Sequence, residues 1–132
     1  MVISDEIHFG LILTGHEHSV YPSLSDDALN HTILCTAASK TFNLVGFRNS
    51  NIIIANKDLR DQYIETYEKM SLEIHMPNTL GLYATQVAYV DDFLALIEMN
   101  YKLIQSFLDL HLPQIKGSPL KGTYFCGLIL EH

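Results

Sequence analysis

The chain has 132 residues, enough for one domain with a packed core, and 48% of them are hydrophobic, which excludes a disordered chain. The formal charge of −7 comes from 15 acidic and 8 basic residues, and the basic residues form no stripe that could hold a phosphate backbone. We therefore do not expect nucleic acid as a partner.

The first part of the chain predicts a strand and then a short helix. Residues 2–4 are an apolar run that suits a buried parallel strand. Asp5 would lie at the carboxyl end of that strand, where open α/β sheets place their ligands. Ser25 can cap a helix whose first turn holds Asp26 and Asp27.

Two further strands are predicted next. The run 32–37, TILCTA, is β-branched and apolar, and Lys40 comes shortly after its end. After Gly46, the run SNIIIAN predicts a third strand, which Asn56 terminates. From Lys57 the apolar residues fall four, four and three positions apart, which predicts a helix with one buried face. These residues are Leu59, Tyr63, Tyr67 and Met70.

A second helical region is expected after Pro77, with Asn78 or Thr79 as its cap. Apolar residues recur through 80–112, which is long for one globular helix, so we expect a bend or break between residues 89 and 92. Charged and amide side chains interrupt the region, and it therefore does not predict a membrane span.

The last part of the chain predicts a loop and a final strand. Pro113 ends the helical region, Gly117 and Pro119 mark a loop, and residues 122–130 have the β-branched and aromatic content of a strand. The order strand, helix, strand, strand, helix, helix, strand predicts an α/β fold. Because the chain starts in mid-strand and residues 130–132 have the form of a tag remnant, we expect an excised part of a longer protein.

The cysteines and histidines predict neither a disulfide nor a metal centre. Cys35 and Cys126 lie far apart, each in an apolar run, and no signal peptide precedes the first strand, so we interpret them as reduced thiols of a cytoplasmic protein. His16 and His18 could point the same way along an extended segment toward a metal ion. No cysteine or further histidine lies at a ligand spacing, so no metal site is expected.

Lys40 is the residue with the clearest functional interpretation. A lysine after a strand is most often a solvated loop residue, but here Asp5 ends one apolar run, Lys40 follows another, and Arg48 comes eight residues later. Three segments that contain these residues or lie beside them resemble the fold-type I pyridoxal-phosphate enzymes. They are SDEIHFGLILTGHEHSVYPSLS, TAASKTFNLVG and SNIIIANKDLR. The DEIH and SKTFN forms resemble the cystathionine β-lyase-like C-S lyases of the aminotransferase superfamily, and the resemblance covers nearly the whole chain.

This resemblance implies roles for five residues. Lys40 would be the lysine whose amine condenses with the cofactor aldehyde. Asp5 would pair with the pyridine nitrogen and keep the ring protonated, so that the ring accepts electron density. His8 stands where many aminotransferases have a tyrosine that contacts the ring oxygen, although a local hydrogen bond would explain a histidine equally well. Ser39 and Arg48 would bind the cofactor phosphate.

Two positions leave the branch of the superfamily open. Ala37 stands where many aminotransferases have a serine, whereas Arg48 follows the general aminotransferase pattern. In both branches the amino acid substrate would displace Lys40, and the freed lysine would take the α-proton as a general base. Loss of a β-thiolate would make the enzyme a C-S lyase that releases ammonia and pyruvate. Reprotonation at the cofactor would make it an amino acid aminotransferase.

The resemblance also implies the fold and the domains. The expected fold is a fragment of an aspartate aminotransferase-like large domain, residues 1–90, with the start of the small domain, residues 91–129. The glycine-containing phosphate loop, the stacking aromatic residue and the substrate arginine of the family have no counterpart here. We therefore expect weak cofactor binding and little turnover by this chain, or a non-catalytic domain, and uncovered apolar faces that favour a homo-oligomer.

Overall fold

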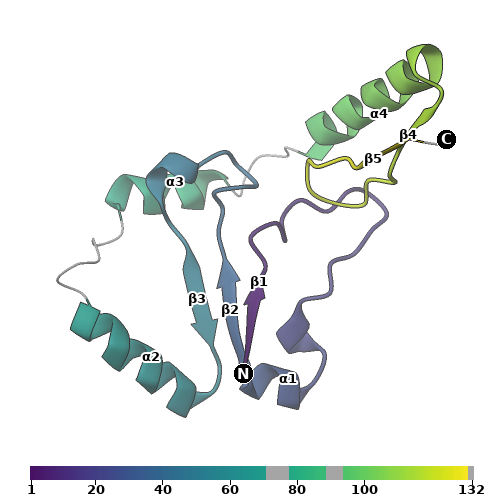
Figure 1. Ribbon diagram of the computed structural model, residues 1–132. Helices are drawn as coiled ribbons and strands as arrows, with labels where there is room; N and C mark the ends of the chain where they lie inside the picture. Colours follow the sequence, from purple (N-terminus) through teal and green to yellow (C-terminus); the bar gives the residue numbers. More distant parts are fainter. Residues whose placement is uncertain (71–77, 89–93, 131–132) are drawn as a thin grey trace. The chain divides into compact units, whose positions relative to one another are not determined.

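The computed structural model describes residues 1–70, 78–88 and 94–130 (Figure 1). Their helices and strands follow the order β1, α1, β2, β3, α2, α3, α4, β4, β5, with two short 3-10 turns, η1 (Tyr21–Ser23) and η2 (Val45–Phe47). The mixture of helices and strands agrees with the predicted α/β class. The chain divides into two compact units, Met1–Gly10 with His18–Val90 and Leu11–Glu17 with Asp91–His132.

The first unit contains a three-stranded mixed sheet in the order β1-β2-β3 (Figure 1). Strand β1 (Val2–Asp5) runs parallel to β2 (Thr32–Thr36), with Asp5 opposite Cys35. Strand β3 (Asn51–Ile54) pairs with β2 in the antiparallel direction. All three strands were predicted. Because β1 and β2 are parallel neighbours, their carboxyl ends and the loops that follow lie at one edge of the sheet.

Helix α1 (Asp26–Asn30) begins where the sequence predicts. The side-chain oxygen of Ser25 accepts a hydrogen bond from the Ala28 backbone N–H at 3.0 Å, and Asp26 and Asp27 lie in the first turn. The Thr32 hydroxyl, at the start of β2, donates to the Ala28 carbonyl. This bond attaches the end of the helix to the central strand.

Asparagine caps precede the next two helices. Asn56 Oδ1 accepts from the Leu59 N–H at 3.1 Å ahead of α2 (Lys57–Met70). Asn78 Oδ1 accepts from the Leu80 N–H at 3.0 Å ahead of α3 (Thr79–Ala88). Of the two residues considered as the cap of this helix, Asn78 therefore makes the bond, while Pro77 itself lies outside the described residues.

Two predictions of burial are wrong. Ile3 in β1 is 65% exposed, and the burial alternates along the strand, so the face of β1 that carries Ile3 is not covered. Helix α2 has no buried residue, and Tyr63 and Tyr67 are each 37% exposed. Periodicity identifies which face of a helix is apolar, but not whether another part of the chain covers that face.

The second unit contains α4 (Leu94–His111), which ends before Pro113 as predicted. Strands β4 (Ile115–Gly117) and β5 (Leu128–Leu130) form an antiparallel pair. The predicted final strand over 122–130 is therefore too long, and the loop expected at Gly117 is in part strand β4. Ser118, just after β4, also bonds across the hairpin. Its N–H donates to the Gly127 carbonyl at 2.7 Å, and its hydroxyl accepts from the Gly127 N–H.

The segment Leu11–Glu17 supplies part of the core of this second unit. Leu11 is fully buried and clusters with Leu13 and Ile97, with Leu94 and Leu120 packed against them. The Leu11 carbonyl accepts from the Thr123 N–H at 2.6 Å. The bend or break expected between residues 89 and 92 lies outside the described residues. Within the described helices, none is both long enough and apolar enough to cross a membrane.

Candidate functional site

All five predicted site residues lie in the first unit, at the end of β1 or in the loops that follow β1 and β2. Asp5 is the last residue of β1, and His8 is half-buried in the turn after it. Ser39 and Lys40 lie in the turn after β2, and Arg48 lies further along the same loop. The parallel pairing of β1 and β2 thus brings the two loops with these residues to the same edge of the sheet.

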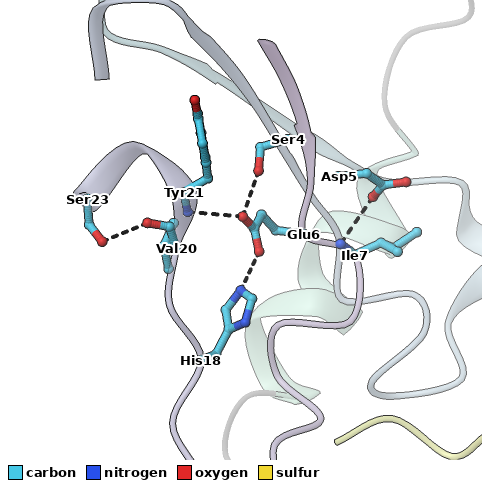
Figure 2. A network of polar contacts seen from close by, with 8 residues as sticks. All are labelled: Ser4, Asp5, Glu6, Ile7, His18, Val20, Tyr21 and Ser23. Carbon is cyan, nitrogen blue, oxygen red and sulfur yellow. Dashed lines mark hydrogen bonds and ion pairs between the residues drawn. The ribbon is translucent and has the colours of Figure 1, made fainter. Parts of the chain in front are cut away.

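Asp5 ends β1 and bonds to the turn that follows it. Its Oδ1 accepts a hydrogen bond from the Ile7 backbone N–H at 3.2 Å, and the residue is exposed (Figure 2). Burial, together with the negative charge of Asp5 across the strand pair, raises the pKa of the Cys35 thiol. The carboxylate of Asp5 is therefore electrostatically coupled to the end of β2, from which the Lys40 turn begins.

The turn that carries Ser39 and Lys40 is held by its backbone. The Phe42 N–H donates to the Ala38 carbonyl at 3.0 Å, and the Leu44 N–H donates to the Ser39 carbonyl at 2.9 Å. Ala38 is 3% exposed, whereas Ser39 and Lys40 are half-buried. The small buried residue before them anchors the turn and leaves the hydroxyl and the amine partly accessible.

Arg48 adopts an uncommon backbone conformation. It follows the 3-10 turn η2 (Val45–Phe47) with φ 53° and ψ 40°, in the left-handed region, and its N–H donates to the Val45 carbonyl at 3.2 Å. A non-glycine residue in this region costs about 1 kcal/mol and is often found at ligand-binding positions. The side chain is exposed and available to bind an anion.

Glu6 is a site-adjacent residue that the sequence interpretation missed. Its Oε1 accepts from Ser4 Oγ at 2.7 Å and from the Tyr21 N–H at 3.3 Å, and His18 Nε2 donates to Oε2 (Figure 2). Burial raises the pKa of Glu6, but the bonds from Ser4, Tyr21 and His18 outweigh it, and the pKa is lowered. The signal in the sequence was the placement of Ser4 and Glu6 two residues apart, on one side of a strand.

The alternative of a metal site has no support in the described part of the chain. His18, one of the two histidines considered for it, pairs with Glu6. Across residues 1–70, 78–88 and 94–130, no three His, Cys, Asp or Glu side chains group closely enough to hold a metal ion. The second unit has a hollow of about 210 Å³, lined among others by Tyr101 and Cys126, but none of the five predicted site residues lines it.

Comparison with known proteins gives the family. Residues 1–111 match the family described as aminotransferase class I and II. The chain belongs to this family. The α/β fold inferred from the resemblance is confirmed for an aminotransferase fragment, because solved family structures align with nearly all of this chain and about a third of their own length.

Relatives of this chain include proteins named as a cystathionine beta-lyase and a C-S lyase. Cystathionine beta-lyase PatB of Bacillus subtilis (strain 168) is 36% identical over 133 residues, 96% of this chain and 34% of PatB. Cystalysin of Treponema denticola, whose crystal structure contains pyridoxal 5'-phosphate, is 35% identical with a TM-score of 0.85 over 97% of this chain and 34% of that one. The pyridoxal-phosphate-bound C-S lyase of Staphylococcus hominis is 25% identical with a TM-score of 0.76, over 96% and 32%. The chain thus spans about a third of the length of these relatives.

Proposed function

We propose that this chain is the part of a pyridoxal-phosphate-dependent C-S lyase that carries its reactive lysine, and that the whole enzyme acts on sulfur amino acids such as cystathionine by β-elimination. The proposal rests on one observation: the DEIH and SKTFN segments lie at the carboxyl ends of two adjacent parallel strands, at the same sheet edge. The relatives named as cystathionine beta-lyase and C-S lyase support this choice of branch.

The donor groups at the site fit the cofactor. Within the described residues, Asp5 Oδ1 accepts a hydrogen bond from the Ile7 N–H, which leaves Oδ2 to accept a bond from a protonated ring nitrogen. Lys40 would supply the amine that holds the cofactor aldehyde. Ser39 and Arg48 offer a hydroxyl and a guanidinium for the phosphate, and the guanidinium suits bidentate binding. His8, half-buried after β1, would contact the ring oxygen.

The roles of the residues in the reaction follow from these groups. When bound, pyridoxal phosphate supplies an electron sink for the charge left at the α-carbon of the amino acid. Lys40 Nζ, released from the cofactor by the substrate amine, would take the α-proton as the general base. Asp5 would hold the proton on the ring nitrogen by its negative charge, and Arg48 would keep the phosphate in place.

Borohydride trapping tests the proposal on the 132-residue chain. After incubation with pyridoxal phosphate and reduction, mass spectrometry of the peptides should find the label at Lys40, and Lys40→Arg should abolish that label. Lys57→Arg is the matched control, because Lys57 is exposed and paired with Asp61, and it should leave the label unchanged. Label distributed evenly over the exposed lysines would overturn the proposal. We expect weak binding and little release of pyruvate from cystathionine by this chain alone.

An aminotransferase is the second candidate, favoured by Arg48 and by the family. It is separated from the C-S lyase by its products, because transamination yields a keto acid with the carbon skeleton intact and no ammonia.

We also propose that the protein acts in the cytoplasm, since both cysteines are free thiols, and that it forms a homo-oligomer. Exposed apolar side chains of α3, such as Leu80 at 71% and Tyr83 at 68%, support self-association. A monomer in size-exclusion chromatography at high concentration would contradict it.

A further inference from the structure

Glu6 is the one buried acidic residue in the described part of the chain, with 7% of its surface exposed. A buried carboxylate is costly unless donors satisfy it, and here a hydroxyl, a backbone N–H and an imidazole all converge on it. Two of these three donors, Tyr21 N–H and His18, belong to a loop more than ten residues away in sequence. The carboxylate therefore ties the end of β1 to that loop.

The backbone of Glu6 is fixed at both of its polar groups as well. Its N–H donates to the Cys35 carbonyl at 2.9 Å, which continues the parallel ladder one residue beyond β1. Its carbonyl accepts from the Phe9 N–H at 2.9 Å, which closes the turn after the strand. The residue immediately after Asp5 is thus held by main-chain and side-chain bonds together.

Glu6 and Asp5 project to opposite sides of the strand. Figure 2 shows Ser4 and Glu6 on one side and Asp5 with Ile7 on the other, as the alternation of an extended chain requires. Glu6 therefore cannot touch a ligand that Asp5 binds from its own side. Any effect of Glu6 on such a ligand must act through the backbone of residues 5 to 7. That backbone also sets the 3.2 Å bond from the Ile7 N–H to the exposed Asp5 carboxylate.

We propose that Glu6 is a positioning residue, which holds the end of β1 so that the Asp5 carboxylate keeps the direction needed to pair with the ring nitrogen of the cofactor. The inference rests on the proposed function for the identity of that ligand. The link between Glu6 and the direction of Asp5 is independent of the ligand and can be measured without it.

The first test is hydrogen exchange at the Ile7 amide, whose acceptor is Asp5 Oδ1, in the chain without cofactor. Glu6→Gln should reduce the protection of this amide by about tenfold, while the amides of β2 keep theirs. Glu17→Gln makes the same chemical change at an exposed glutamate and should alter neither. Unchanged protection at Ile7, or an equal loss throughout the sheet, would overturn the inference.

The second test is the absorbance spectrum of bound pyridoxal phosphate, with Asp5→Asn as the reference for a lost ring-nitrogen partner. At equal occupancy, Glu6→Gln should shift the spectrum toward that of Asp5→Asn. The double variant Ser4→Ala with His18→Ala keeps the charge of Glu6 and removes two of its donors, and it should shift the spectrum in the same direction. A lower occupancy with an unaltered spectrum would contradict a positioning role.

The outcomes separate this inference from the proposed function. If the unaltered chain takes up no pyridoxal phosphate, the proposed function fails, and Ile7 exchange alone decides whether Glu6 positions Asp5. If the chain binds the cofactor and Ile7 exchange is unaffected by Glu6→Gln, the inference fails and the proposed function stands. Circular dichroism verifies folding, and if Glu6→Gln does not fold, Ser4→Ala and His18→Ala must each lower the protection at Ile7.

Discussion

Gly10 lies against Thr41, so closely that a β-carbon on Gly10 would come within 2.9 Å of the Thr41 hydroxyl oxygen. Gly10 is in the loop after Asp5, and Thr41 directly follows Lys40. The contact therefore joins the loop that follows the proposed ring-nitrogen partner to the turn that carries the proposed reactive lysine. Thr41 is 4% exposed, so its side chain cannot make room for the added atom by moving into solvent.

Gly10→Ala is expected to lower the free energy of unfolding by about 1–3 kcal/mol, because the new methyl group overpacks this contact. Urea unfolding followed by circular dichroism measures the change. Gly46→Ala is the control, since a β-carbon there would meet nothing within 4 Å. Thr41→Ala should restore much of the loss in the double variant, and an additive double variant would contradict the contact.

Gly81→Ala tests how α3 packs within the first unit. Alanine normally stabilises a helix relative to glycine by about 1 kcal/mol. At this position, however, the β-carbon would come within 2.6 Å of Asn49 Nδ2 and 2.8 Å of Phe47 Cβ. We therefore expect the opposite sign, a loss of about 1–3 kcal/mol in thermal or urea unfolding. A stabilised variant would mean that α3 does not pack against the loop at residues 47–49.

The lowered pKa of Glu6 predicts a dependence of stability on pH. Because the folded chain binds this proton less tightly than the unfolded chain does, the contribution of Glu6 is complete above the usual glutamate pKa of about 4.3 and is lost as the pH falls below it. The free energy of unfolding should thus decline less steeply from about pH 5 to about pH 3 in Glu6→Gln than in the unaltered chain. Hydrogen bonds from Thr14 lower the pKa of Glu98 in both proteins, so the contribution of Glu98 to the pH dependence is the same in both and cancels in the comparison. Parallel pH profiles would contradict the prediction.

The reactivity of Cys35 reports the charge of Asp5 without any cofactor. Burial and the Asp5 carboxylate raise the pKa of this thiol, so less of it is the nucleophilic thiolate at pH 8. Asp5→Asn removes the charge and should speed alkylation of Cys35 by about twofold or more. Cys126, in the other unit, is the internal control and should react at the same rate in both proteins. An unchanged rate at Cys35 would mean that the charge of Asp5 does not act on the thiol at the end of β2.

Features of the fold set by nearby residues could be predicted from the sequence. Ser25 and Asn78 accept bonds from N–H groups two or three residues ahead, and such caps depend on local residue types alone. The location of Asp5 and Lys40 at strand ends followed from the apolar runs before them. Arg48, in contrast, owes its left-handed backbone to the turn around it, and no residue type at that position indicated this conformation.

Features that need distant partners could not be predicted. The Glu6 carboxylate accepts hydrogen bonds from the Tyr21 N–H and from His18. These donors reach it only because the chain leaves the sheet after β1 and returns beside it at residues 18–21. The exposed face of Tyr63 and Tyr67 looked like a core face because periodicity carries no information about what lies opposite. Strand β4 was missed for the same reason, since Ile115–Gly117 becomes a strand only by pairing with β5.

The excursion of Leu11–Glu17 into the second unit affects the order in which the chain can fold during synthesis. Ile97 follows Leu11 by 86 positions, so Leu11 and Leu13 leave the ribosome long before their packing partner exists. At typical elongation rates of about 5–20 residues per second, this delay is roughly 4 to 17 s. During this delay Leu11 and Leu13 remain exposed apolar side chains. Strand β1, which precedes them, and strands β2 and β3, which follow them, can already form their sheet.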